Sequence, residues 1–333
     1  MTESKAPLFV VGCTRSGTTI LHDMLMKACP DAVDLTSDDD FECRSFWQEF
    51  GLMIGSRRTG SLCKCASNKD IVEKHRTEIQ AYVTARSKGG GIITKNPHLM
   101  NKISYVANVL PDARFVLIVR EIMSVVASTK VGFSKAHKGD EDYPSFIHYW
   151  PDAQLPCWSY VEDDMAKNIL RKRELYRGIK RLFRTLRNKN HQGSEEPGKV
   201  FPLRKLSDFQ KEHPDVSRYY PGSGFSRIPE SWLSLNSNAL KQLAGINPER
   251  WMVVSYQNLV EDPKNTIGGI LRFGKFKATA LESVPPELNR KTSEKWRTNL
   301  TAEEQVIVRK QVNEKRDDYA NICAAVGAEL LAE

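Results

Sequence analysis

The sequence predicts an α/β fold of three layers, in which helices cover both faces of a central parallel sheet. Short buried strands alternate with amphipathic helices in three separate parts of the chain. This alternation favours parallel pairing, because each helix carries the chain back across the sheet before the next strand begins. With 333 residues, the chain is long enough for one large domain with a sizeable core.

The first of these parts starts with the apolar run at residues 8–11, which we predict as a buried strand ended by Gly12. A helix is expected over residues 18–28, where apolar side chains recur on one face. The link between them, Gly12-Cys-Thr-Arg-Ser-Gly-Thr-Thr19, nearly fits the phosphate-binding pattern G-x-x-x-x-G-K-[ST]. A loop between a strand and a helix N-terminus is the context that this pattern requires.

Two further parts repeat the alternation. Hydrophobic periodicity and Gly/Pro punctuation predict a strand at 92–94, a helix at about 97–110, a strand at 114–119, a helix from about Met123, a strand at 251–255, and, after a turn, a helix from near Pro263. The strands contribute to one sheet in this interpretation, and we find no internal repeats.

Residues 131–249 differ in character, and we expect them to form a mainly helical cap inserted in a single domain over residues 1–333. They include a basic amphipathic stretch at 171–189 and a polar loop containing Gly and Pro. The basic stretch is either a solvated helix face or a contact with an anionic partner. An aromatic cluster either lines a ligand pocket or packs the cap: Tyr143, Phe146, Tyr149, Trp150 and Trp158.

Composition limits the classes of function. The net charge of +8 suits an anionic ligand and does not by itself indicate nucleic-acid binding, so we expect no nucleic-acid partner. No apolar run is long enough for a membrane span or a signal peptide. Seven scattered cysteines are typical of reduced thiols in a cytoplasm. Cys63 and Cys65 have no second pair at matching spacing, so we expect no metal.

The loop after the first strand carries groups suited to an oxyanion. Glycine permits the tight turn that points successive backbone N–H groups at the anion, and the helix N-terminus adds positive potential. Ser16, Thr18 and Thr19 offer hydroxyls, and Arg15 offers a full charge. Thr18 stands where ATP and GTP enzymes have the lysine that bridges two phosphates, so we expect a ligand with fewer phosphates and no metal. The alternative is a purely structural glycine turn.

The loop resembles that of sulfotransferases that use 3′-phosphoadenosine 5′-phosphosulfate (PAPS), whose pattern is [KR]-S-G-T-[ST]. A second signature of that family, a strand ending in Arg with Ser eight residues later, is matched by Arg120 and Ser128. The resemblance implies a P-loop-like sulfotransferase fold and a 3′-phosphate held by these two residues. It assigns the 5′-phosphosulfate to the loop residues Arg15, Ser16, Gly17, Thr18 and Thr19. Taken alone, Arg120 would be read as a surface ion-pairing residue.

Two later segments extend the resemblance to residue 300. "VVSYQNLVEDP" is similar to the family's strand-Tyr segment and implies that Tyr256 lies near the adenine. "NRKTSEKWRTNLT" is similar to the C-terminal segment that folds over the cofactor, which implies that Arg290 and Lys291 hold the 3′-phosphate. The sequence departs from the family pattern at Gln257, which replaces an acidic residue, and at Thr292, which replaces a glycine.

The resemblance also implies catalytic groups. Lys95, in "TKNPHLMNK", matches the lysine that contacts the transferred sulfuryl group, and His98 stands near the place of the general base. A neutral imidazole near pH 7 is suited to take a hydroxyl proton. Glu42 is a rival base, because the aromatic residues around it would raise the pKa of its carboxyl. Arg15 would neutralise charge on the leaving phosphate.

These observations predict a cytoplasmic sulfotransferase. Such an enzyme would move a sulfuryl group from PAPS to a hydroxyl or amine of a small-molecule or glycan-like acceptor, and release 3′,5′-ADP. One alternative is a P-loop kinase, which the missing lysine disfavours. The other is a basic module that binds polyanions or anionic membranes without inserting into them. The identity of the acceptor and the oligomeric state stay open, a homo-oligomer included.

Overall fold

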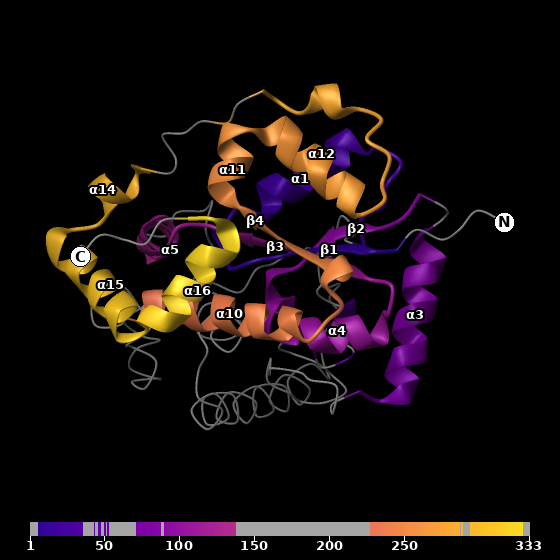
Figure 1. Ribbon diagram of the computed structural model, residues 1–333, viewed down its shortest axis with the longest axis horizontal. Coiled ribbons are helices and arrows are strands. Elements are labelled where there is room, and N and C mark those ends of the chain that lie inside the picture. Colours follow the sequence, from indigo (N-terminus) through magenta and orange to yellow (C-terminus); the bar gives the residue numbers. More distant parts are fainter. Residues whose placement is uncertain are drawn as a thin grey trace, which may run out of the picture.

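Four parallel strands form the central sheet: β1 (Leu8–Val11), β2 (Ile93–Lys95), β3 (Arg114–Val119) and β4 (Trp251–Ser255). Their order across the sheet is β2-β1-β3-β4, with β1 between β2 and β3 (Figure 1). The computed structural model describes residues 6–35, 43, 46–47, 50, 52, 71–87, 90–137, 227–286, 288 and 294–328. Three strands have the predicted bounds, and β2 begins and ends one residue later than predicted.

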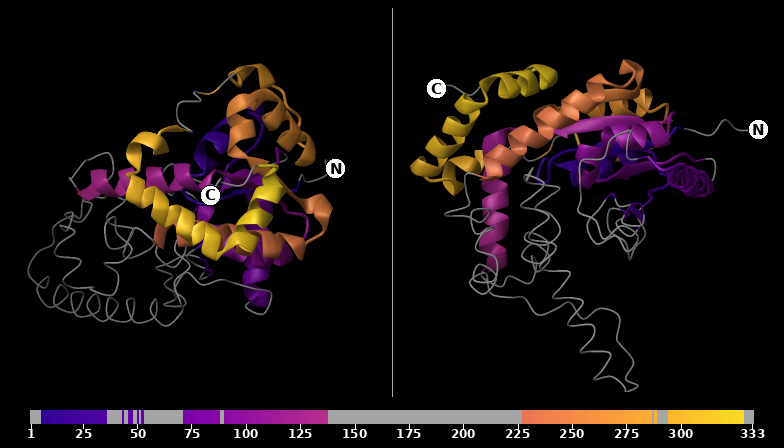
Figure 2. Two further views of the ribbon diagram at one scale, coloured as in Figure 1. Left: turned by 60° about the vertical axis from the view of Figure 1, so that its left-hand side comes forward. Right: turned by 90° about the horizontal axis from the view of Figure 1, so that it is seen from below.

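Each face of the sheet packs against its own layer of helices. Alternate residues of a strand point to opposite faces, so Phe9 and Val11 enter one core cluster while Leu8 and Val10 enter the other. The Leu8 face is covered by α1 (Thr18–Ala28), α11 (Tyr256–Glu261) and α12 (Pro263–Phe273). The Phe9 face is covered by α4 (Ile103–Val109), α5 (Ile122–His137) and α10 (Arg227–Ala244). The predicted three-layer α/β architecture is confirmed (Figures 1 and 2).

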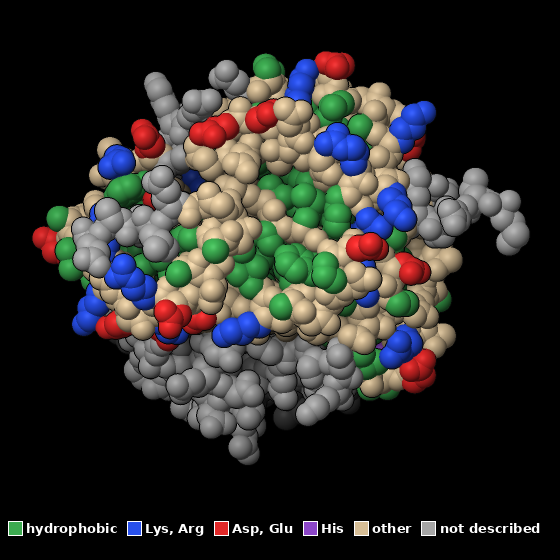
Figure 3. All heavy atoms as spheres, in the orientation of Figure 1, with side chains coloured by type: hydrophobic (Ala, Val, Ile, Leu, Met, Phe, Trp, Pro, Cys, Tyr) green, Lys and Arg blue, Asp and Glu red, His purple; other side chains and the backbone are tan. Residues whose placement is uncertain are grey.

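The strand β4 forms one edge of the sheet in the described structure. Trp251, Met252 and Val253 are half-buried, whereas the residues of β1 are fully buried. Figure 3 shows hydrophobic side chains gathered at the middle of this face, below α12 and α11. An edge strand keeps one row of its backbone N–H and C=O groups outside the sheet's hydrogen bonds. The edge at β4 is therefore less enclosed than the central strand β1.

Further elements complete the described fold. They are α3 (Glu73–Ser87), the 3₁₀ helices η3 (Pro97–Lys102), η7 (Pro248–Arg250) and η8 (Leu281–Ser283), and the helices α14 (Trp296–Asn299), α15 (Ala302–Glu314) and α16 (Arg316–Val326). A capping box between Thr301 and Glu304 starts α15, since each side chain bonds the other residue's backbone N–H.

Two predicted elements differ from the structure. The helix expected over 97–110 is split into η3 and α4, because the Asn96 side chain caps the His98 N–H and Pro97 starts a tight 3₁₀ turn. The turn expected after β4 is the short helix α11, whose start is capped by the Ser255 hydroxyl. The helix α3, which has a weak apolar periodicity, was not predicted.

The segment expected as a cap lies largely outside the described residues, including the basic stretch at 171–189 and the aromatic cluster. Its last part, α10, packs against α4, α5 and η3 on the Phe9 face of the sheet. Among the helices that the structure describes, none is long and apolar enough to cross a membrane. Within the same residues, no cluster of three or more His, Cys, Asp or Glu side chains is arranged to hold a metal ion.

The central position of β3 predicts a large stability effect. Leu117 is fully buried between β1 and β4, so Leu117→Ala should lower the free energy of unfolding by about 2–5 kcal/mol. Val306 is 63% exposed on α15, so Val306→Ala should change it by less than about 0.5 kcal/mol. Urea unfolding followed by circular dichroism measures both, and an equal loss in the two variants would contradict the described core.

Candidate active site

The carboxyl ends of the four strands meet at one edge of the sheet, and most of the predicted site residues that the structure describes follow them directly. The loop after β1 contains Arg15 and Ser16, β2 ends at Lys95, Arg120 follows β3, and Tyr256 follows β4. Ligands bind at this edge in open α/β sheets, because the loops and helix N-termini point there. Parallel pairing therefore brings together residues that lie far apart in the sequence.

The loop between β1 and α1 is a tight turn shaped by close contacts. Gly17 has a φ of 94°, and a Cβ there would lie 2.5 Å from Cδ2 of Tyr256. A Cβ on Gly12 would lie 2.7 Å from the carbonyl oxygen of Ile118. Arg15 also has a positive φ, of 68°, which is uncommon for a residue with a side chain and costs about 1–3 kcal/mol. The surrounding contacts hold this conformation, and strain of this kind gathers at functional sites.

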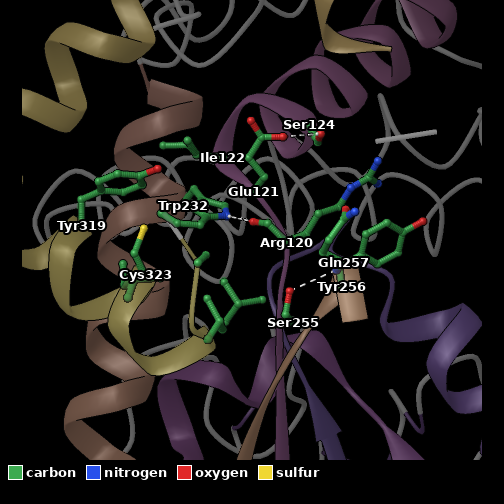
Figure 4. A pocket seen from close by; sticks show the side chains of 14 residues that line it. Arg120, Glu121, Ile122, Ser124, Trp232, Ser255, Tyr256, Gln257, Tyr319 and Cys323 are labelled. Atoms are coloured by element: carbon green, nitrogen blue, oxygen red, sulfur yellow. Dashed lines mark hydrogen bonds between the residues drawn. The ribbon is translucent and has the colours of Figure 1, made fainter. Parts of the chain in front are cut away.

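Four of the predicted residues meet beside this loop, and we call them the arginine cluster: Arg15, Arg120, Ser128 and Tyr256. The Arg15 Nε donates to the Ser128 hydroxyl at 3.0 Å. The Arg120 Nη1 donates to the Arg15 carbonyl oxygen at 3.2 Å. The Arg120 guanidinium lies 4.4 Å from the centre of the Tyr256 ring, and Figure 4 shows these two side chains next to each other. The cluster thus joins the ends of β1, β3 and β4 with the second turn of α5.

The arginine cluster concentrates positive charge in a partly buried place. Burial lowers the pKa of the Arg120 guanidinium below its ordinary value, and the neighbouring charge of Arg15 acts in the same direction, against Tyr256 and Glu121. Two like charges held together in this way favour the binding of an anion between them. Burial also raises the pKa of the Glu121 carboxyl, which accepts a hydrogen bond from the Ser124 hydroxyl at 3.0 Å.

Ser16 supplies a further sign that the loop is built for a ligand. Its hydroxyl is fully buried, and its Oγ has no hydrogen-bond partner in the described structure. A buried hydroxyl that lacks a partner costs about 1–3 kcal/mol, so such groups usually have a functional reason. An anion oxygen in the loop would satisfy it. Thr18, by contrast, is buried at the first turn of α1, and Thr19 is exposed.

Lys95 and His98 lie on the other flank of β1. Lys95 pairs in register with Val10 and is 5% exposed. His98 is 4% exposed in the first turn of η3, where Asn96 accepts its backbone N–H at 2.8 Å and the buried Lys102 Nζ donates to its carbonyl oxygen at 2.7 Å. Because β1 separates β2 from β3, these two residues lie on the opposite side of the loop from Arg120.

Three predicted site residues, Glu42, Arg290 and Lys291, lie outside the described residues. The structure adds residues that no sequence pattern indicated. Trp232 donates through Nε1 to the Arg120 carbonyl oxygen at 3.0 Å, and Asn236 donates to the Cys13 Sγ at 3.3 Å. Burial raises the pKa of the Cys13 thiol to about 12, against the effect of the Asn236 bond. The thiol is therefore neutral near pH 7 and unsuited to act as a nucleophile.

A cavity of about 290 Å³ adjoins the arginine cluster (Figure 4). Its walls come from the ends of β3 and β4 and from α10 and α16, and include Arg120, Glu121, Trp232, Tyr256, Tyr319 and Cys323. Aromatic and aliphatic walls with a few polar groups at one end are typical of small-molecule sites. Arg120 and Tyr256 belong to both the cavity and the cluster, so one ligand can contact the two.

Among the comparisons with known proteins, the scan of protein families gives a match. A sequence model of the sulfotransferase family matches residues 7–173, which is half of the chain and includes the loop, Lys95, Arg120 and Ser128. No curated protein sequence matches the chain at a significant level.

Among solved structures, a sulfotransferase from Alicyclobacillus acidocaldarius has a TM-score of 0.47 and 11% identity over 98% of this chain and 97% of its own. The sulfotransferase domain of a Synechococcus olefin synthase has a TM-score of 0.42 and 15% identity over 94% and 96%. A sulfotransferase from Mycobacterium tuberculosis has a TM-score of 0.41 and 13% identity over 96% and 78%.

The close approach of Gly17 to Tyr256 leads to a test. Gly17 and Gly327 both have a positive φ, but a Cβ on Gly327 would meet no atom within 4 Å. Gly327→Ala should therefore cost only the left-handed backbone term, about 1 kcal/mol. Gly17→Ala should cost at least about 1 kcal/mol more, because the Tyr256 ring must move. Urea unfolding measures both, and equal costs would mean that the ring does not press on the loop.

Proposed function

The chain belongs to the sulfotransferase family, and we propose that it transfers a sulfuryl group from PAPS to a hydroxyl or amine of a small-molecule or saccharide acceptor. The observation that carries this proposal is the arginine cluster, in which Arg15, Arg120 and Ser128 meet beside a loop with an unsatisfied buried Ser16 hydroxyl. Two cationic side chains and two hydroxyls at one point suit a ligand that carries two separate phosphate groups.

The loop residues fit the 5′-phosphosulfate end of the cofactor. Ser16 would complete its hydrogen bonding with an anion oxygen, and Arg15 and the backbone N–H groups at the start of α1 would neutralise its charge. Gly17 lets the Tyr256 ring pack directly against the loop, and Thr18 and Thr19 add hydroxyls at the helix start. Thr18 takes the place of the lysine that a triphosphate requires, so the loop suits a shorter ligand.

Within the arginine cluster, Arg120 and Ser128 fit the 3′-phosphate. Arg120 and Ser128 would hold this group, together with Arg290 and Lys291 as the sequence predicts. The ring of Tyr256 and the adjoining cavity offer an apolar and aromatic place for the nucleoside. No metal is needed in this arrangement, because the arginines supply the positive charge.

When bound, the cofactor supplies the sulfuryl group, and the acceptor oxygen or nitrogen forms the new bond to sulfur while the bond to the phosphate oxygen breaks. Arg15 and Ser16 would stabilise the charge that develops on the departing phosphate, and Lys95 would neutralise the transferred group. His98 or Glu42 would take the acceptor's proton. Anchoring both phosphates holds the reacting atoms in place, and such positioning contributes much of the rate enhancement in reactions of this kind.

We propose a soluble cytoplasmic enzyme of one domain, with the acceptor bound by the segment 131–249. The scattered cysteines and the absence of an apolar span in the sequence support this location. The two alternatives, a kinase and a polyanion-binding module, would bind other ligands than the proposed enzyme, so ligand binding distinguishes the three.

Ligand preference tests the cofactor. 3′,5′-ADP should raise the melting temperature and bind in calorimetry, whereas Mg²⁺-ATP should not compete with it. Arg120→Ala and Ser128→Ala should weaken the binding of 3′,5′-ADP, the former by about 10- to 100-fold, because a charge-assisted hydrogen bond to phosphate is lost. Lys310→Ala, a change of one exposed charge on α15, is the matched control and should leave binding unchanged.

The opposite preference would overturn this proposal. Protection by Mg²⁺-ATP without protection by 3′,5′-ADP would indicate a kinase. Tight binding to heparin or anionic vesicles, lost when the basic residues at 171–189 are neutralised, with no nucleotide binding, would indicate the polyanion module.

The general base is tested by transfer from ³⁵S-labelled PAPS to a panel of phenols, alcohols, amines and monosaccharides. We expect His98→Ala to lower kcat by about 10²- to 10⁴-fold on the best acceptor of the panel, with the affinity for 3′,5′-ADP unchanged. Glu42→Ala is the paired variant. A large loss of kcat in Glu42→Ala and none in His98→Ala would assign the base to Glu42 instead.

A further inference from the structure

The helix α10 presents buried polar side chains to the candidate site. Trp232 is 3% exposed and donates to the Arg120 carbonyl oxygen at 3.0 Å. One turn later, Asn236 is fully buried and donates to the Cys13 Sγ at 3.3 Å. Residues four apart lie on one face of a helix. A single face of α10 therefore bonds to the loop after β1 and to the turn after β3.

The same helix also bonds to the segment that carries His98. Asn238 donates to the Asn101 side chain at 2.7 Å, and Gln242 donates to the Met100 carbonyl oxygen at 2.9 Å. The Gln242 side-chain oxygen in turn accepts the backbone N–H of Ser104 at 3.1 Å. Three separate segments of the candidate site are thus tied to one rigid element.

Polar groups in such buried positions need a reason. Leu233, Ala239 and Leu243 of α10 already fill the core on this side of the sheet. Further apolar residues would pack there without the cost of removing a polar side chain from water. Unlike apolar contacts, the hydrogen bonds from Trp232 and Asn236 are directional, so each fixes the orientation of one group in the site.

We propose that Trp232 is a positioning residue for the 3′-phosphate clamp and that Asn236 is one for the loop after β1. Trp232 fixes the Arg120 carbonyl oxygen, and with it the peptide plane from which the Arg120 side chain leaves the backbone (Figure 4). Asn236 fixes Cys13, two residues before Arg15. This inference rests on the proposed function, since it concerns how the two phosphates of its nucleotide are held.

The two residues should therefore affect different phosphates. Trp232 acts on Arg120, whose charge is assigned to the 3′-phosphate and not to the 5′-phosphate in the proposed complex. Asn236 acts on the loop, which would hold the 5′-phosphate. AMP carries the 5′-phosphate alone, so the ratio of the affinities for 3′,5′-ADP and AMP separates the two effects. A general loss of packing in the site would weaken both nucleotides alike.

The experiment compares Trp232→Phe, which removes the indole N–H and keeps an aromatic ring, with Ser237→Ala as the matched control. Ser237 lies on the same helix, but its hydroxyl donates to Asp318 of α16 at 2.7 Å, away from the cluster. Isothermal titration with 3′,5′-ADP and AMP gives both dissociation constants. We expect Trp232→Phe to weaken 3′,5′-ADP by about 3- to 10-fold and AMP by less than about 2-fold. Ser237→Ala should change neither.

Asn236→Ala provides a second and opposite test. It should weaken 3′,5′-ADP and AMP by the same factor, because both ligands use the loop. Unchanged affinities in Trp232→Phe, or an equal loss for both ligands, would overturn the role of Trp232. A loss confined to 3′,5′-ADP in Asn236→Ala would overturn the role of Asn236. If the unmodified protein binds neither nucleotide, the proposed function itself fails, which is a distinct result.

Discussion

The candidate site depends on the burial of β1 between β2 and β3. All four residues of β1 are fully buried, and each side of the strand pairs in parallel with a neighbour. The end of β1 therefore fixes where the loop from Gly12 to Gly17 emerges, and its neighbours fix what stands beside that loop. Lys95 comes from one neighbour and Arg120 from the other. The position of these groups is a consequence of strand order, not of contacts among the groups themselves.

The arginine cluster and the loop beside it are costly to assemble. Arg15 is held at a positive φ, two guanidinium groups are brought together, and the Ser16 hydroxyl of the loop has no partner in the described structure. An anion bound there would offset the repulsion between the two guanidinium groups and give the Ser16 hydroxyl a partner, so these two costs would act as preorganisation for a ligand. The buried bonds from α10 explain how the fold tolerates this: they attach the loop and the Arg120 turn to a helix in the core.

The parts of the site that follow local patterns were predictable from the sequence. The strands, the loop and the Arg120–Ser128 pair all have a recognisable spacing in the sequence. The structure brings Arg15, Ser128 and Arg120 together, and their roles toward a nucleotide stay predictions. The roles of Trp232 and Asn236 were not predictable, because their hydrogen-bond partners lie 112 and 223 residues away in the sequence. A periodic sequence pattern indicates only local structure and not such long-range bonds. The split of the helix after β2 was missed for a local reason, the Asn96 cap, whose signal is a single residue.

Strand order also bears on the direction of the proposed reaction. In-line transfer needs the attacking atom and the departing phosphate on opposite sides of sulfur. The arginine cluster joins the loop after β1 to the ends of β3 and β4, where the two phosphates of the nucleotide would be anchored. Lys95 and His98 lie on the β2 side. In the proposed reaction, the groups that anchor the nucleotide and a base on η3 would therefore reach the loop from opposite flanks of β1, as the order β2-β1-β3-β4 places them.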